Sequence, residues 1–390
     1  MNNRPHNPTR LLPLFFLLTR LVLLLSLPLD GLRGYGDFVH FYRLAKMGWP
    51  FIDIWVEFPP LFPFLSAALF HLVGNREHAY DYLLIILLNL VQAVNIWLFV
   101  RLAQRIYSEK AGLLRALSYT AILAGLAYGW WYFDPLAECF MLLGLVWLLE
   151  GRDRRAGVSL ALGVLTKWFP ALVLPVVWKV RPPRAALAIT TLTLGIPLLL
   201  YACLTLASPQ MTLASLGAQG SKGSWETVWA LIDGNLDTGN FGPEMERYDP
   251  ATARLLRGKP ARLPAWLSLL PLLALGAWLW WKARLENDRA VLAFVGLTWC
   301  LFLLWSPGWS TQWVLYLLPL ILLSLPAREA ILMAAALVLV NLTEWPVLLS
   351  RGYNWGLWLT IPVRTLLIAL LAVEFWQAAK KPSDEPVQDS

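Results

Sequence analysis

The sequence predicts an all-α protein that crosses a membrane many times. Of its 390 residues, 58% are hydrophobic and only 15% are charged, and the mean hydropathy is +0.56. Soluble domains are rarely so apolar. Apolar runs also recur along the chain, and most are close to the length that crosses a hydrocarbon core of about 30 Å. The predicted spans are 11–29, 82–104, 112–130, 135–149, 185–206, 263–282, 289–306, 311–325, 329–346 and 355–377.

The apolar segment 156–178 differs from these spans because Lys167 and Pro170 interrupt it. Arginine and lysine residues flank it on both sides, and the positive-inside rule keeps both flanks in the cytoplasm. The segment must therefore enter the membrane and return, either as two short helices or as a re-entrant hairpin, with Lys167 near its apex. Counted as two passes, it brings the total to about twelve transmembrane helices.

The same charge rule orients the rest of the chain. Both termini are predicted to be cytoplasmic, and two long segments, Asp30–Asp81 and Ala207–Arg262, are predicted to lie outside. This topology requires Pro59–Val73 to be an interfacial helix on the outer leaflet. Residues 1–380 then form a single transmembrane domain, and the polar residues 381–390 form a disordered cytoplasmic tail. In a prokaryote, such a protein lies in the plasma membrane with its long polar segments extracytoplasmic.

Charge and motifs argue against several other functions. The net charge of +7 comes mostly from lysine and arginine in loops, so it reports orientation and not nucleic-acid binding. The three cysteines lie in apolar segments without a CxxC pair, which indicates neither a disulfide framework nor a zinc site. No P-loop, HExxH or GxSxG motif is present in the sequence.

The first outer segment places carboxylates directly after a membrane span, in the stretch GYGDFVHFYRLAKMGWPFIDIWVEFPPLFPFL from Gly34 to Leu65. A carboxylate at the outer interface can accept a proton from a sugar hydroxyl, so Asp37 is a candidate base. Aspartate is also a favoured helix N-cap, and the helical FVHFYRLAKMG follows Asp37 directly. Asp53 and Glu57 lie four residues apart, which suits a second acid pair or a metal site, whereas a solvated loop is the alternative for Asp53.

Lys167 is the most informative cation, because an ammonium group inside an apolar hairpin is costly unless it has a partner. A phosphate is one natural partner. A salt bridge to Asp134 or Glu138, at the start of the preceding span, is the alternative. Arg351 in SRGYNW is a weaker phosphate candidate, and Trp225 is suited either to stacking on a sugar ring or to an aromatic belt.

Taken in order, these motifs resemble the GT-C class of membrane glycosyltransferases. The first outer segment carries D-x-x-x-x-Y from Asp37, then G-W-P-F and E-F-P-P-L. Leu149–Pro175 is similar to a hairpin motif with a lysine, and Trp305–Pro319 is similar to a late SPQ-x-x-x-W motif, with Gln312 near the family's glutamine. The set is closest to the polyprenol-phosphate-mannose-dependent α-mannosyltransferases of glycosyltransferase family 87. The tripeptide DPL from Asp134 departs from the Gly-Gln-x-Asn motif of many members, which leaves the sugar and the subfamily open.

The resemblance implies a mechanism and a set of site residues. Juxtamembrane helices of the first outer segment would carry the catalytic base, at Asp37, with Glu57 as an acceptor-site or orienting acid. The donor would be a sugar, by default mannose, on a polyprenyl phosphate, and the acceptor a glycan, glycolipid or protein. Displacement would invert the anomeric carbon without a cofactor, and a divalent metal is an alternative that is not expected. The implied contacts are Lys167 and Arg351 for the donor phosphate, and Asp53, Asp134, Trp225 and Gln312 for the substrates.

Two other functions remain open from the sequence. A secondary transporter or lipid flippase often has broken helices in two matching halves, whereas this sequence shows one broken hairpin without a second copy. A polymerase or ligase that acts on a diphosphate-linked glycan would need a large outer loop rich in arginine and histidine, but Ala207–Arg262 contains no histidine. The sequence therefore favours a glycosyltransferase that uses a lipid-phosphate sugar at the outer face.

Overall fold

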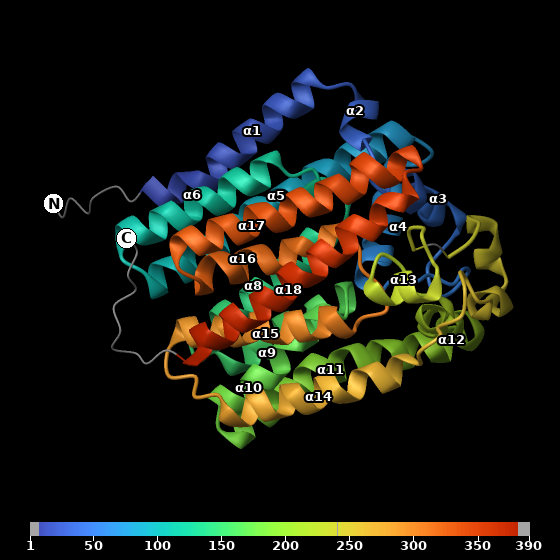
Figure 1. Ribbon diagram of the computed structural model, residues 1–390. Helices are drawn as coiled ribbons and strands as arrows, with labels where there is room; N and C mark the ends of the chain where they lie inside the picture. The colour runs from blue at the N-terminus through green and yellow to red at the C-terminus, as the bar shows by residue number, and fades with distance from the viewer. Residues whose placement is uncertain (1–7, 240, 381–390) are drawn as a thin grey trace.

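The computed structural model describes residues 8–239 and 241–380, which fold into a bundle of helices that run beside one another (Figure 1). Within these residues, β-structure is limited to isolated bridges. The predicted tail, 381–390, lies outside the described residues. The α-helices are α1 (Leu12–Ser26), α2 (Leu29–Arg33), α3 (Phe38–Met47), α4 (Leu61–Val73), α5 (Glu77–Ile106), α6 (Glu109–Gly125), α7 (Tyr128–Trp131), α8 (Asp134–Leu149), α9 (Asp153–Thr166), α10 (Leu174–Val180), α11 (Pro183–Ala207), α12 (Pro209–Gly217), α13 (Val228–Asp233), α14 (Ala265–Lys282), α15 (Asp288–Trp305), α16 (Val314–Ser324), α17 (Ala327–Leu342) and α18 (Leu357–Lys380).

Short helical turns of other types connect these α-helices. The 3₁₀ turns are η1 (Pro8–Leu11), η2 (Phe169–Val173), η3 (Ala218–Ser221), η4 (Glu244–Tyr248), η5 (Pro250–Arg254), η6 (Thr311–Trp313), η8 (Leu349–Arg351) and η9 (Asn354–Gly356). A π-helical turn, η7 (Thr343–Leu348), follows α17 and contains Trp345 in a non-helical conformation. Four of these turns, η2, η3, η4 and η6, contribute residues to the cavity described below.

Seven helices of the described chain are long and apolar enough to cross a membrane. They cover Thr9–Ser26, Glu77–Ile106, Pro183–Ala207, Ala265–Lys282, Asp288–Trp305, Ala327–Arg351 and Asn354–Lys380. Shorter apolar helices of 10–17 residues cover Leu61–Val73, Phe169–Val180 and Thr311–Ser324. The protein is thus an all-α, multi-pass membrane protein, as predicted, while the total of about twelve passes stays a prediction.

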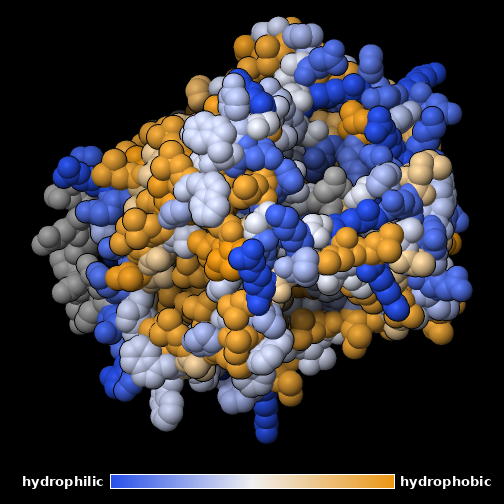
Figure 2. Space-filling model, turned by 45° about the vertical axis from the view of Figure 1, so that its right-hand side comes forward, coloured by the Kyte–Doolittle hydropathy of each residue, from blue (hydrophilic) through white to orange (hydrophobic). Residues whose placement is uncertain are grey.

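Polar and apolar surfaces separate along the bundle. Hydrophobic side chains gather over its body, whereas hydrophilic residues gather at one end (Figure 2). Large apolar side chains on the body are solvent-exposed, including Leu198 (71%), Leu206 (86%) and Trp281 (80%). Apolar surface this extensive is expected to face lipid. The polar end is the one where α3, α12 and α13 lie, opposite η1 and the end of α18 (Figure 1).

The two segments predicted to lie outside the membrane form this polar end. We call 30–81 the first cap segment and 207–262 the second cap segment. The last residues of the first cap segment, 77–81, are already part of α5, which begins at Glu77 and not near residue 82 as predicted. Arg33 of α2 binds Glu77 at 2.8 Å and also binds Asp81. Because both carboxylates have a cationic partner there, the helix can begin before the apolar run.

The segment 156–178 is broken where the lysine and proline interrupt it. α9 ends at Thr166, and the chain returns through η2 and α10. Proline has no N–H to continue a helix, and Pro170 instead packs closely against Gly163 of α9. At the other end, Arg181 Nε lies 2.9 Å from Asp153 Oδ1, so the start of α9 and the end of α10 lie at the same level of the bundle.

The two cap segments dock through Trp55, whose side chain is 1% exposed. Its Nε1–H lies within hydrogen-bond distance of Glu246 O (3.2 Å), Asp249 O (3.1 Å) and Thr252 Oγ1 (3.1 Å). The neighbouring Val56 N–H donates to Ser215 Oγ at 2.9 Å. A buried indole with polar partners fixes both position and orientation. The second cap segment is therefore an ordered part of the fold.

The second cap segment also binds the stretch 305–313, between α15 and α16. The Trp225 N–H donates to Pro307 O at 3.1 Å, and the Trp309 N–H donates to Trp225 O at 3.0 Å. The Trp225 ring covers Gly308 so closely that an added Cβ would lie 2.1 Å from it. Both cap segments and this stretch thus converge at the polar end.

Candidate active site

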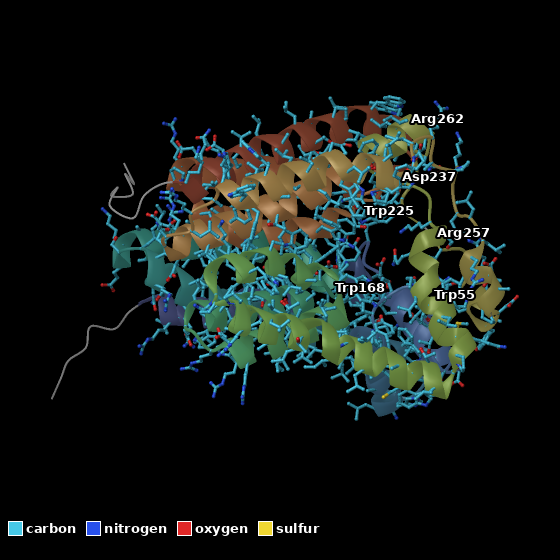
Figure 3. The ribbon with its side chains drawn as sticks, turned by 90° about the horizontal axis from the view of Figure 1, so that it is seen from below. Trp55, Trp168, Trp225, Asp237, Arg257 and Arg262 are labelled. Carbon is cyan, nitrogen blue, oxygen red and sulfur yellow. The ribbon has the colours of Figure 1, made fainter. Side chains whose placement is uncertain are left out.

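A cavity of about 1000 Å³ lies where the cap segments meet the break after α9 and the stretch 305–313. Of the residues predicted from the sequence, its wall contains Asp37, Glu57, Lys167, Trp225 and Gln312. Trp168 and Trp225, which both line this wall, are labelled in Figure 3. The cavity is thus built by segments that are far apart in the sequence.

Asp37 stands at the N-cap position of α3, but its side chain does not cap the helix. The backbone holds it instead, because the Asp37 N–H donates to Trp131 O at 3.2 Å. Burial raises the pKa of Asp37 to about 6, although the positive charges of His40 and Lys167 oppose this rise. A carboxylate with such a pKa is mostly ionised at neutral pH and is a better proton acceptor than an ordinary aspartate.

The glycines of the GYGD motif allow the chain to approach Trp131. An added Cβ on Gly36 would lie 2.9 Å from the Trp131 backbone, and Gly34 has a positive φ of 48° with Trp131 against it. Positive φ favours glycine. The motif therefore sets the position of Asp37 against α7.

With Asp37 as the predicted base, Gly36→Ala is expected to lower turnover by about 10- to 100-fold, because even a small displacement of a reacting group is costly. The measurement is turnover by the purified variant. Gly31→Ala is the control, since its added Cβ would meet Pro28 at an ordinary 3.6 Å. Equal turnover in both variants would contradict this role of the glycine.

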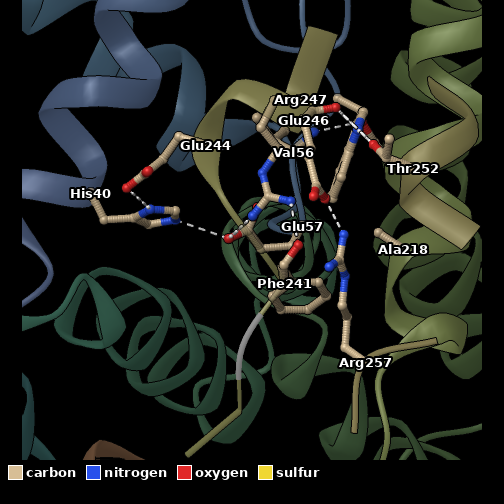
Figure 4. A network of polar contacts seen from close by, with 12 residues as sticks. His40, Val56, Glu57, Ala218, Phe241, Glu244, Glu246, Arg247, Thr252 and Arg257 are labelled. Atoms are coloured by element: carbon tan, nitrogen blue, oxygen red, sulfur yellow. Dashed lines mark hydrogen bonds and ion pairs between the residues drawn. The ribbon is translucent and has the colours of Figure 1, made fainter. Parts of the chain in front are cut away.

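Glu57 is held by His40 and Arg247, which both contact its carboxylate (Figure 4). His40 Nε2 donates to Glu57 Oε1 at 2.9 Å, and Arg247 Nη2 lies 3.3 Å from the same oxygen. On its other side, His40 Nδ1 lies 3.6 Å from Glu244. The Arg247 guanidinium also lies 3.9 Å from the centroid of the Trp55 ring. This buried network joins the first cap segment to the second.

The network decides what Glu57 can do chemically. Burial would raise the pKa of Glu57, but the hydrogen bond from His40 and the charge of Arg247 hold the pKa at about 2. Such a carboxylate stays ionised and is a poor base. Its Oε2 is buried without a protein partner among the described residues. Of the two carboxylates, Asp37 is therefore chemically better suited to accept a proton than Glu57.

Lys167 lies at the break itself, and its side chain is 13% exposed. Its Nζ is 2.7 Å from Asp134 Oδ1. The salt bridge to Asp134, one of the alternatives considered from the sequence, is thus present, and Lys167 still lines the cavity. Its proposed contact with a phosphate stays a prediction.

Two predicted site residues lie away from the cavity wall. Asp53 is exposed and accepts a hydrogen bond from the Trp49 N–H at 2.7 Å, which stabilises its own turn. Arg351 is exposed and donates to Val347 O within η7 and η8. Their positions support neither substrate nor phosphate contact. Asp134 is not part of the described cavity wall, but it contacts the wall through its bond to Lys167.

The sequence model of glycosyltransferase family 87 matches residues 55–307 of this protein. The chain belongs to glycosyltransferase family 87. The family resemblance noted from the motifs is therefore confirmed, and the protein is a membrane glycosyltransferase. The matched region contains Glu57, Lys167 and Trp225, whereas Asp37 precedes it and Gln312 follows it.

One solved structure similar to this glycosyltransferase is the apo oligosaccharyltransferase of Archaeoglobus fulgidus. The two share 12% sequence identity with a TM-score of 0.47. The alignment covers 98% of this chain but only 57% of the other, so this chain spans little more than half its length. No match is found among curated proteins.

Four ionisable residues of the cavity wall were not assigned a role from the sequence: His40, Lys222, Glu244 and Arg247. His40 follows Asp37 by three residues, so the helical spacing of the DFVH motif could have indicated it. The other three lie in the second cap segment, far from Asp37 in the sequence. Their position depends on tertiary docking, and no local pattern signals it.

Activity of this glycosyltransferase is expected to fall below about pH 6, because Asp37, with its pKa raised to about 6, becomes protonated there. Glu57 stays ionised on this limb, since its pKa is about 2. Burial alone would lower the pKa of His40, but its bond to Glu57 raises the pKa above its usual value. The measurement is kcat/KM between pH 4.5 and 8. If the loss of kcat/KM at low pH occurs at the same pH in Asp37→Glu as in wild type, the titrating group is not Asp37.

Proposed function

We propose that this glycosyltransferase transfers a sugar, by default mannose, from a polyprenyl phosphate to a hydroxyl of a glycan, glycolipid or protein. The observation that carries the proposal is an apolar groove of about 560 Å³ between α10, α14 and α15, next to the polar cavity. Leu172, Phe302 and Trp305 line both spaces. A donor with a charged sugar-phosphate head and an isoprenoid tail matches this pair of environments.

The groove suits a hydrocarbon chain. Apart from Thr298, its lining consists of aliphatic, aromatic, proline and glycine residues. Its walls belong to helices whose outer faces are apolar, so a lipid tail can enter from the bilayer without leaving hydrocarbon. Leu172 lies in η2, five residues beyond Lys167, so the groove begins close to the break in the segment 156–178.

The chemistry is a single displacement at the anomeric carbon. Asp37 accepts the proton of the acceptor hydroxyl while the oxygen of that hydroxyl forms a bond to the anomeric carbon. The bond from the carbon to the phosphate oxygen breaks, and polyprenyl phosphate leaves with the electron pair. Attack opposite the leaving group inverts the anomeric configuration. Fixed positive charge near the phosphate stabilises the leaving group, and Glu57, fixed by His40 and Arg247, orients the acceptor.

The proposed reaction takes place on the extracytoplasmic side. Basic residues concentrate at the end of the bundle away from the cavity, around the turns that follow α5, α8, α10 and α14. They include Arg101, Arg105, Arg152, Arg181 and Lys282. Because positive loops stay in the cytoplasm, the cavity and the cap segments face the opposite side.

The test is transfer from radiolabelled polyprenyl-phosphate mannose to a host lipid extract by the purified protein. Labelled nucleotide-mannose and a polyprenyl-diphosphate sugar are tested in parallel. The expected result is a new labelled product from the monophosphate donor alone. Product from the nucleotide sugar alone would overturn the proposal. Ion-dependent flux in proteoliposomes without glycoside product would instead support a transporter.

Transfer is expected to be independent of divalent metals, because protein cations meet the phosphate charge. Within the described residues, no group of three or more His, Cys, Asp or Glu side chains is arranged to hold a metal ion. The measurement is the transfer rate after treatment with a chelator and again after adding Mg²⁺ or Mn²⁺. A loss that the metal restores would contradict a metal-free mechanism.

A further inference from the structure

The charged side chains around the active-site cavity form pairs, with two exceptions among the described residues. The pairs are Lys167 with Asp134 (2.7 Å), His40 and Arg247 with Glu57 (2.9 and 3.3 Å), and Arg43 with Glu244 (3.5 Å). The exceptions are Asp37 and Lys222, which both line the cavity. Asp37 has been assigned the role of base. Lys222 is therefore the cation in the described wall that has no carboxylate within ion-pair distance, although the charges of Glu57, Glu226 and Asp37 act on it from further away.

Aromatic rings surround the Lys222 ammonium group. Its Nζ lies 3.6 Å from the centroid of the Trp225 ring and 4.4 Å from that of Phe241. Burial lowers the pKa of Lys222 to about 8. Ring faces attract the positive charge, but they do not replace oxygen acceptors for three N–H donors. An ammonium group held in this way is ready to bind an incoming anion.

The position of Lys222 relates it to the apolar groove. The Trp225 ring beneath it contacts the stretch 305–313, since Trp225 Nε1 lies 3.4 Å from Ser310 Oγ and the ring covers Gly308. Trp305, at the start of this stretch, lines both the cavity and the groove. A lipid whose tail fills the groove can therefore present its head group to the wall that carries Lys222.

We propose that Lys222 binds the phosphate of the lipid donor, and that Lys167, already paired with Asp134, is the secondary cation. This rests on the proposed function, because it takes the donor to be a polyprenyl-phosphate sugar. A sugar-phosphate diester carries one negative charge, which one unpaired ammonium group balances. A diphosphate brings further charge, for which the described wall has no additional unpaired cation.

The role extends to catalysis, because the charge on the phosphate grows as its bond to the sugar breaks. The diester becomes a monoester, and the electron pair stays on the phosphate oxygen. An ammonium group fixed on two rings stabilises the separated charge more than the ground state. Loss of Lys222 is therefore expected to lower kcat as well as donor affinity.

The test measures binding of polyprenyl monophosphate, and of the polyprenol of equal length, to the full-length protein in nanodiscs. Wild type is compared with Lys222→Met and Lys222→Gln, and with Lys222→Arg, which keeps the charge. Lys259→Met is the matched control, since Lys259 is an exposed lysine of the same cap segment outside the cavity wall. Thermal unfolding is recorded for every variant.

The expected result is that wild type and Lys259→Met prefer the phosphate over the alcohol. Lys222→Met and Lys222→Gln lose about 10- to 100-fold of this preference, as expected for a charged hydrogen bond, with polyprenol binding unchanged. Lys222→Arg retains most of it. If folded Lys222→Gln keeps the full preference, Lys222 is not the phosphate contact, although the proposed function stands. If wild type itself shows no preference for the phosphate, the proposed donor is wrong.

Discussion

Replacing Asp37 with asparagine is expected to reduce sugar transfer by about 10²- to 10⁴-fold, the usual contribution of a general base. Asparagine has almost the same shape but cannot accept the proton of the acceptor hydroxyl. Because the backbone and not the side chain holds residue 37 in place, the fold should be unaffected. The measurement is single-turnover transfer from a labelled lipid donor.

The Asp37 prediction has a matched control in the same cap segment. Asp30 is a carboxylate of the same segment whose side chain is 94% exposed and lies outside the described cavity wall. Asp30→Asn should transfer at the wild-type rate, and both variants should bind the donor and unfold at the wild-type temperature. Turnover of Asp37→Asn within a few-fold of Asp30→Asn would remove Asp37 as the base.

The second large effect is expected from Arg247→Met, which should destabilise the docked cap segments by about 3–5 kcal/mol. The substitution leaves the 4%-exposed Glu57 without its guanidinium partner. It also removes a hydrogen bond to Phe241 O (3.1 Å) and the contact with the Trp55 ring. The measurements are thermal unfolding in detergent and the rate of proteolytic cleavage within 207–262.

Arg254→Met is the matched control for this prediction, because Arg254 is exposed in the same cap segment. It should unfold and resist protease like wild type. A Glu57→Gln/Arg247→Met double variant should recover part of the loss, since it no longer buries an unpaired carboxylate. Identical cleavage of Arg247→Met and Arg254→Met would show that the buried pair does not hold the cap segments together.

Hydropathy located most long helices well, because crossing hydrocarbon demands an unbroken apolar run. The span predicted at 263–282 is the helix Ala265–Lys282, and that at 289–306 is Asp288–Trp305. The method is less accurate where a charge is neutralised by a distant partner. Arg33 neutralises acids at the start of α5, and this helix therefore begins before the apolar run.

The break at Lys167 was predictable from local chemistry, because a lysine and a proline interrupt an apolar segment. Its partner was not predictable, since Asp134 and Glu138 are one helical turn apart. The structure separates them: Glu138 accepts a hydrogen bond from the Tyr119 hydroxyl at 2.6 Å, whereas Asp134 faces Lys167. The partners of Glu57 were even less predictable from the sequence, because Arg247 follows Glu57 by 190 residues.

Because the partners in the docked cap segments are far apart in the sequence, they are synthesised at different times. Trp55 and Glu57 leave the ribosome well before Arg247, and at about 5–20 residues per second roughly 10 to 40 seconds separate them. During this interval the Glu57 carboxylate stays hydrated at the membrane surface. Arg364, which binds Glu226 O beside the cavity wall, is made later still. A nascent chain therefore inserts most of its helices before the cavity wall, which extends to Trp313, is complete.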